Sequence, residues 1–217
     1  MNIRNLSENN SILNHFLNQI RDVKIQTDSM RFRRNIERIG EIMSYEISKN
    51  LNYKALQVQT PLGVKHTNTI ADKIVVCSVL RAGLALHQGF LNYFDDCQNG
   101  FVAAYRYHPN NDSQFEIRFE YQALPDISDK ILLLVDPMIA TGQSLVVVCQ
   151  DIFQKYSPKE VHIASVIAAP EGIAYLQNHL KGNINLWTAA IDDKLNNQKY
   201  IVPGLGDAGD LAYGTKI

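Results

Sequence analysis

Short apolar runs alternate with amphipathic stretches through the middle of this chain of 217 residues. Each run is bounded by turn-forming residues, which favours a strand, and the stretches between runs carry apolar side chains at helical spacing. Strands that alternate with helices are typical of βαβ units, in which helices cover both faces of a parallel sheet. The sequence therefore predicts an α/β fold with a central, mainly parallel sheet flanked by helices. The predicted strands are Ile74–Leu80, Phe101–Tyr107, Ile131–Val135, Val161–Ala168 and Ile184–Ile191.

Helices are predicted between these strands and ahead of them. One runs from Gly83 to Phe94, another runs from Leu145 to Tyr156, and a third begins at Pro170, a residue common in the first helical turn. Two apolar stripes at helical spacing make residues 1–50 an N-terminal helical segment.

Two hairpins are predicted outside the parallel plan. Leu56–Asn68 turns around Pro61–Gly63. Phe115–Tyr121 alternates apolar with charged residues, which indicates a half-exposed strand returning antiparallel to the second predicted strand through Pro109–Asp112. We expect this hairpin, residues 101–121, to project as a lid, although a static edge hairpin fits the pattern equally well.

Charge and cysteine content exclude several classes of protein. Lysine and arginine number 21 against 22 acids, so no general attraction to nucleic acid or anionic lipid is expected. The longest apolar run falls well short of the roughly 20 residues that a membrane helix needs. Three cysteines without a Cys-x-x-Cys pair support neither a zinc ribbon nor a disulfide framework. We expect one domain, residues 1–217, working in the cytoplasm.

An anion site is predicted where the strand Ile131–Val135 ends. Asp136 closes that strand, and a tight turn with Thr141, Gly142 and Ser144 then leads into a helix. Backbone amides, hydroxyl groups and a helix N-terminus together suit a phosphate, and Asp136 can accept hydrogen bonds from sugar hydroxyls. The Walker A pattern is absent. A capped turn without any ligand remains the alternative at this stage.

Two arginines and a glycine-rich segment complete the candidate site. Arg81 follows another strand end and precedes two small residues, so its guanidinium can pair with phosphate oxygens, or form a surface ion pair instead. Arg106 lies at the base of the predicted lid. Tyr200–Asp210 holds three glycines and a proline, which we interpret as an irregular loop that exposes its own amides and carbonyls to a flat heterocycle. A flexible tail is the alternative.

Together these segments resemble the uracil phosphoribosyltransferase family, which has a type I phosphoribosyltransferase fold. Gln143 departs from the small residue that is usual in the phosphate loop, and the first thirty residues match poorly. The resemblance covers about Arg31–Lys216. The matching stretches are Leu80–Gly83, Tyr105–Arg106, Val135–Gly142, Ala168–Gly172 and Pro203–Asp210.

The resemblance implies a reaction in which uracil and 5-phosphoribosyl 1-diphosphate (PRPP) give UMP and diphosphate. It implies catalytic roles for Arg81, Arg106 and Asp136, and a Mg²⁺ cofactor held mainly through PRPP, with Asp207 as the nearest protein carboxylate. The PRPP-binding residues implied are Arg81, Arg106, Asp136, Pro137, Met138, Ile139, Ala140, Thr141, Gly142, Gln143, Ser144 and Asp207. The uracil-binding residues implied are Ile201, Gly206, Asp207 and Ala208, within a C-terminal segment of residues 192–217.

The expected chemistry passes through an oxocarbenium-like transition state, with negative charge growing on the leaving diphosphate beside the two arginines. A backbone amide and carbonyl within Gly206–Ala208 would pair with O4 and N3–H of uracil and leave both unpaired with cytosine. No general base is evident. A homodimer or larger homo-oligomer is expected, with small-molecule substrates and neither nucleic acid nor membrane as partners.

Two other functions remain open on the sequence alone. An RNA-binding regulator of pyrimidine genes can share this fold, and a cluster of arginines, Arg31–Arg38, is its local support. A transferase for a different base is the second. A purely structural role fits poorly with glycine-rich loops at several strand ends.

Overall fold

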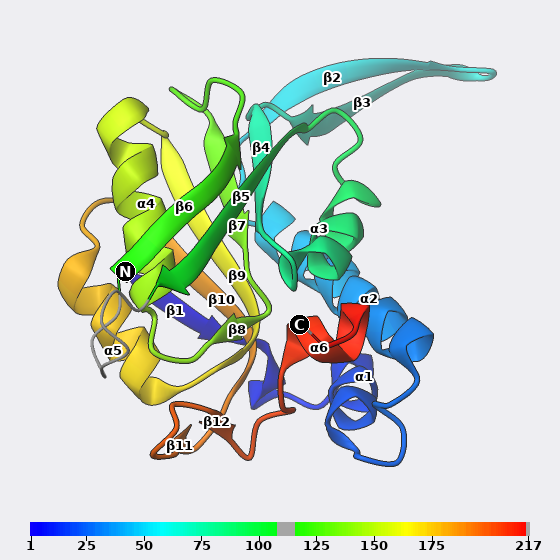
Figure 1. Cartoon of the computed structure of the whole chain (residues 1–217). Coiled ribbons are helices and arrows are strands. Elements are labelled where there is room, and N and C mark those ends of the chain that lie inside the picture. The colour runs from blue at the N-terminus through cyan, green and yellow to red at the C-terminus, as the bar shows by residue number, and fades with distance from the viewer. Residues whose placement is uncertain (108–115, 216–217) are drawn as a thin grey trace.

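An eight-stranded sheet forms the centre of the molecule in the computed structural model, which describes residues 1–107 and 116–215. The order along the main path is β1-β10-β9-β7-β4-β5-β6, and β8 pairs with β9. Every pairing is parallel except that of β5 with β6, so the predicted mainly parallel sheet is confirmed (Figure 1). The strands are β1 Asn2–Asn5, β4 Ile74–Val79, β5 Gln98–Tyr107, β6 Glu116–Ala123, β7 Ile131–Val135, β8 Met138–Ile139, β9 Glu160–Ala168 and β10 Ile184–Ile191.

Helices cover both faces of this sheet, because its central strands are apolar on both sides. β4 and β7 are buried along their whole length. Two separate hydrophobic clusters result, one under α1, α2 and α3 and the other under α4 and α5. No helix among the described residues is both long and apolar enough to cross a membrane. The helices are α1 Ile12–Arg21, α2 Ser29–Ser48, α3 Gly83–Leu91, α4 Gln143–Lys155, α5 Pro170–His179 and α6 Ala208–Tyr213.

Two short strands, β1 and β8, were not predicted from the sequence. The N-terminal segment is not wholly helical, because Asn2–Asn5 pairs in parallel with β10 at the sheet edge. After Asp136 the chain does not turn at once into a helix, since Met138–Ile139 first pairs with β9. Both strands are held by ladder hydrogen bonds to a neighbour distant in sequence, and they carry no alternating apolar pattern to announce them.

The predicted hairpin around Pro61–Gly63 is confirmed as an arm, formed by β2 Tyr53–Thr60 and β3 Gly63–Ile70. It projects from the body as a two-stranded ribbon (Figure 1). Nearly all of its residues are exposed on both faces, including Leu56 and Val58.

The antiparallel pairing of β5 with β6 confirms the second predicted hairpin, with a register shift between Ala103 and Ala104. Gln122, at the base of β6, donates a hydrogen bond to Asp151 of α4 at 2.7 Å, which ties the hairpin to the body. The predicted turn Pro109–Asp112 lies outside the described residues.

The C-terminal segment is more regular than the glycine content predicted. β11 Lys194–Leu195 pairs with β12 Ile201–Val202, and α6 begins within the segment interpreted as an irregular loop. The carboxylate of Asp207 accepts a hydrogen bond from the Asp210 amide at 3.0 Å, which caps α6. The prediction that Tyr200–Asp210 has no regular structure was therefore wrong at both ends. A good N-cap and tertiary burial outweigh the low helix propensity of Gly209.

Candidate active site

The candidate site lies where β4 and β7 end, at the carboxyl edge of the sheet, which is where open α/β sheets bind ligands. Ser78 and Val135 are paired in register, so the chain segments after these two strands emerge side by side. Gly83 packs closely against both strand ends. A Cβ on Gly83 would lie 2.4 Å from Ser78 Oγ and 3.0 Å from the carbonyl oxygen of Val135, so no larger residue fits there. Arg81 and Asp136 therefore leave the sheet from neighbouring positions.

The phosphate loop, Ala140–Ser144, follows β8 and leads into α4. Gly142 adopts a φ of +76°, and no side chain caps the helix that begins after it. The uncapped N-terminus leaves backbone amides available to an anion. A small cavity of about 70 Å³ opens here, lined by seven of the predicted residues and by Leu145. Those predicted residues are Asp136, Met138, Ile139, Ala140, Thr141, Gly142 and Ser144.

Two predicted residues of this stretch lie differently. The Pro137 carbonyl accepts hydrogen bonds from the amides of Val166 and Ile167, both at 3.0 Å, so it supports β9 instead of lining the small cavity. Gln143 lines a neighbouring cavity of about 530 Å³, together with Glu171 and Lys199. Thr141 lines both cavities, so the second cavity lies between the phosphate loop and the β11–β12 turn.

Gly172 of α5 supports the phosphate loop from behind. A Cβ on Gly172 would lie 2.3 Å from the carbonyl oxygen of Ala140, and one on Gly142 would lie 2.7 Å from the carbonyl oxygen of Gly172. The loop and the start of α5 therefore approach closely enough to exclude any side chain at either glycine. Sequence matching flagged Gly172 but provided no physical reason for it.

Asp136 is half-buried at the end of β7. Desolvation raises the pKa of its carboxyl to about 7, and a 3.4 Å hydrogen bond from the Met138 amide offsets part of that rise. A carboxyl in this state exchanges its proton near neutrality. Sugar hydroxyl groups or a cation placed beside it would favour its ionised form.

Arg81 reaches from β4 to the C-terminal segment. Its Nη2 lies 3.2 Å from Asp210 Oδ1, and its two terminal nitrogens also donate to the Gly214 carbonyl at 3.4 and 3.3 Å. A Cβ on Gly209 would lie 3.9 Å from Arg81 Nη2 and 3.2 Å from Asp207 Oδ1. The arginine predicted for diphosphate and the segment predicted for the base thus meet in space. Arg81 Nε is buried without a hydrogen-bond partner among the described residues.

The predicted base segment folds tightly against the body, which argues against a flexible tail. Ile201, Leu205 and Ala208 are buried. We call Pro203–Asp207 the base loop; Gly204 and Gly206 both have positive φ there. Three of its carbonyls already accept hydrogen bonds from within the protein. The Gly204 carbonyl accepts from Arg21, the Leu205 carbonyl accepts from Gln26, and the Asp207 carbonyl accepts from the Leu211 amide.

Two residues that sequence reasoning missed hold this loop. Arg21, at the end of α1, forms a bidentate ion pair with Asp192, at 2.6 and 2.8 Å, and also donates to the Gly204 carbonyl at 2.8 Å. Asp192 in turn accepts from the Gly204 amide at 2.9 Å. Arg21 lies 171 residues before Asp192 in the sequence, so no local motif could have brought the two together.

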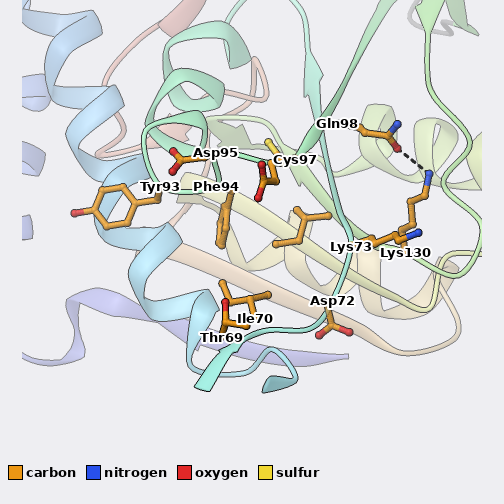
Figure 2. Close-up of a pocket in the computed structure, with 12 residues that line it drawn as sticks. Thr69, Ile70, Asp72, Lys73, Tyr93, Phe94, Asp95, Cys97, Gln98 and Lys130 are labelled. Atoms are coloured by element: carbon orange, nitrogen blue, oxygen red, sulfur yellow. Dashed lines mark hydrogen bonds between the residues drawn. The ribbon is translucent and has the colours of Figure 1, made fainter. Parts of the chain in front are cut away.

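Arg106 lies on β5 opposite Ile117, but its side chain is outside what the structure describes. A separate cavity of about 580 Å³ lies at the opposite edge of the sheet, where β4 and β5 begin (Figure 2). Its walls include Asp72, Phe94, Cys97 and Lys130. It contains none of the predicted site residues.

The carboxylates beside Arg81 suit a magnesium ion carried mainly by a substrate. No group of three or more metal-ligating side chains occurs within residues 1–107 and 116–215. Mg²⁺ commonly binds through one or two carboxylates plus substrate phosphates and water. Asp207 and Asp210 fit that pattern, although both already make hydrogen bonds within or near α6.

Comparison with solved structures defines the class of fold. A hypoxanthine-guanine phosphoribosyltransferase from Bacillus anthracis superposes with a TM-score of 0.51 at 13% identity, covering 72% of this chain and 78% of its own. A protein from Aquifex aeolicus superposes with a TM-score of 0.87 at 31% identity over 99% of both chains. The fold is that of a type I phosphoribosyltransferase.

Sequence comparison narrows the class to one family. The uracil phosphoribosyltransferase model matches residues 7–215. The uracil phosphoribosyltransferase of Porphyromonas gingivalis is 49% identical over 100% of both chains. That of Metallosphaera sedula is 38% identical, covering 92% of this chain and 94% of its own. The chain belongs to the uracil phosphoribosyltransferase family. Its likeness begins well before Arg31, so the expected mismatch of the first thirty residues was overstated.

Proposed function

We propose that this protein transfers the 5-phosphoribosyl group of PRPP to N1 of uracil, forming UMP and diphosphate. One observation carries the proposal: Arg81 contacts Asp210 and Gly214 of the C-terminal segment while its own loop packs against the end of β7. The proposal places an anion-binding turn, a strand-end carboxylate and a glycine-rich base loop around one pair of substrates.

The phosphate loop would anchor the 5-phosphate through backbone amides at the start of α4. Asp136 would accept hydrogen bonds from the ribose hydroxyls, and its negative charge would favour the developing oxocarbenium ion. Because the sugar would be held both at its 5-phosphate and at its hydroxyl groups, its C1 atom would be oriented toward the base.

Arg81 and Arg106 would stabilise the charge that grows on the leaving diphosphate. A Mg²⁺ ion carried by PRPP, with Asp207 or Asp210 nearby, would supply further positive charge at that group when bound. The bond from C1 to the diphosphate oxygen breaks, the uracil N1 forms the new bond to C1, and the N1 proton passes to solvent.

Uracil selection would depend on the base loop. Among its described carbonyls from Gly204 to Asp207, that of Gly206 has no internal hydrogen bond, so it is the natural acceptor for N3–H. An amide from the start of α6 would donate to O4. Cytosine reverses both groups and would leave two polar atoms unpaired, which a buried site rejects strongly.

We further propose a homo-oligomer that assembles through the β2–β3 arm and works in the cytoplasm. An isolated two-stranded hairpin is marginally stable in water, and this one exposes Leu56 and Val58 on one face. A second copy of the chain would cover that face. The three free cysteines suit a reducing compartment.

The test of the activity is UMP formation from labelled uracil, with and without PRPP and magnesium, followed by a screen of cytosine and purine bases. We expect UMP only in the complete mixture and strong preference for uracil. Equal use of cytosine would refute the assigned role of the base loop.

No observation favours the alternative role as an RNA-binding regulator. Among the arginines of α2, Arg34 pairs with Glu37, Arg33 donates to the Ala212 carbonyl and Arg31 pairs with Asp28. Each of these three arginines is therefore already engaged within the protein.

A further inference from the structure

The N-terminal helix α1 ends directly beside the base loop, although no catalytic role was assigned to it. Arg21 is its last residue, and its side chain is about one-fifth exposed, whereas that of Asp192 is 4% exposed. A buried carboxylate that pairs bidentately with an arginine is held in one orientation. Gly204 lies between them: its amide donates to Asp192 Oδ2 and its carbonyl accepts from Arg21.

We propose that Arg21 and Asp192 are positioning residues for uracil recognition, which rests on the proposed function. They hold both polar groups of Gly204, so the chain enters the base loop at a set angle and leaves the Gly206 carbonyl to face the base. Gln26 adds a hydrogen bond of 3.2 Å to the Leu205 carbonyl. The end of α1 and the connection after it therefore occupy the two carbonyls immediately before Gly206.

These contacts of Arg21 and Asp192 should affect the selection of uracil over cytosine. If Arg21 is lost, the Gly204 carbonyl becomes a free acceptor and the turn at Gly204 is no longer held from outside. The base then meets a loop with more than one arrangement of donors and acceptors. Uracil binding should weaken, and discrimination against cytosine should fall. In the proposed function PRPP binds the phosphate loop and Arg81, neither of which makes a hydrogen bond with Arg21, so PRPP binding should change little.

The experiment compares Arg21→Met, Arg21→Lys and Asp192→Asn with the wild-type protein. We expect Arg21→Met to raise the uracil KM about 10-fold, while the PRPP KM stays within about 2-fold. Arg21→Lys should recover only part of the loss, because an ammonium cannot donate in a fork to Asp192 and to Gly204 together. Asp192→Asn keeps an acceptor for the Gly204 amide but loses the charge facing Arg21.

Asp72→Asn is the matched control. The Asp72 side chain is also 4% exposed, accepts from a distant backbone amide, Asn52 N at 2.7 Å, and pairs with Lys159 at 2.5 Å. It lies at the opposite edge of the sheet, in the cavity of Figure 2. We expect Asp72→Asn to cost stability without changing the ratio of the two KM values.

Hydrogen exchange gives a readout that needs no activity. The Gly204 amide should exchange faster in Arg21→Met, while amides of the buried strand β7 keep their wild-type protection. Equal rises in both KM values, an unchanged uracil KM, or slow exchange at Gly204 would each overturn the inference. If the wild-type protein instead failed to use uracil, the proposed function would fall, while the exchange data would still test the loop contact.

Discussion

Arg81 and Asp210 form an ion pair of 3.2 Å between the end of β4 and the helix α6. The pair places a guanidinium from the middle of the chain against the C-terminal base segment. In the proposed reaction, the same guanidinium faces the diphosphate while the base segment faces uracil. In that reaction, uracil and the diphosphate end of PRPP would meet beside this ion pair.

Replacing Arg81 tests its role at the leaving group. We expect Arg81→Lys to lower kcat by about 100-fold or more, because a point charge cannot replace two parallel hydrogen bonds to growing negative charge. Steady-state kinetics with saturating PRPP measures this. Arg34→Lys, in the Arg34–Glu37 pair of α2, is the control and should keep its kcat. A normal kcat in Arg81→Lys would contradict the assignment.

Asp136 predicts a pH-dependent stability. The folded protein raises the pKa of this carboxyl from 3.8 to about 7, so its contribution to stability is fully present below pH 4 and is lost as the pH rises through 7. Asp136→Asn removes that loss. We expect the unliganded variant to gain about 2 kcal/mol at pH 8, less than the whole shift because solvent reaches the half-buried group, and little at pH 4.

Thermal unfolding at both pH values checks this prediction. A gain of this size corresponds to a rise in Tm of about 4–8 °C for a chain of this length. The same variant should lose most UMP formation, since an amide provides no negative charge beside the ribose. An equal Tm difference at pH 4 and pH 8 would rule out the titration of Asp136 as its cause.

Replacing Gly172 should weaken PRPP binding although Gly172 is not among the residues proposed to contact PRPP. In Gly172→Ala, the new Cβ would lie 2.3 Å from the Ala140 carbonyl, so the phosphate loop must shift. We expect the PRPP KM to rise about 10-fold or more, with a smaller change in the uracil KM. Gly182→Ala is the control, because its Cβ would meet nothing within 4 Å, although its φ of +108° strains alanine there. If Gly182→Ala raised the PRPP KM as much as Gly172→Ala, a general loss of stability, and not the contact with Ala140, would explain the result.

The arm predicts how the protein assembles. Leu56 and Val58 lie on one face of the β2–β3 hairpin, and Gln57 and Gln59 lie on the other. We expect Leu56→Lys with Val58→Lys to lower the mass in sedimentation to that of a monomer, because two charges would be buried in the interface. Gln57→Lys with Gln59→Lys adds the same charge to the opposite face and should leave the assembly intact. A monomeric wild-type protein would disprove the assembly.

Local pattern was enough to predict most of the sheet. Ile131–Val135 and Ile184–Ile191 agree with the structure to the residue, because a strand buried on both faces must be a short apolar run between turns. The phosphate loop and Asp136 could also be located, since strand ends and small turn residues carry their signal within a few positions. The family motifs then connected these positions to a reaction.

Contacts between distant segments decided the rest. β1 and β8 exist because a neighbouring strand offers backbone hydrogen bonds, and α6 forms because Asp207 caps it against a packed body. Neither the ion pair of Arg21 with Asp192 nor the contact of Gly142 with Gly172 leaves a trace in local spacing. The amino-acid order determined which chemical groups stand at each strand end. Only the tertiary structure decided which of them meet, because that depends on sheet order and on helices packed across it.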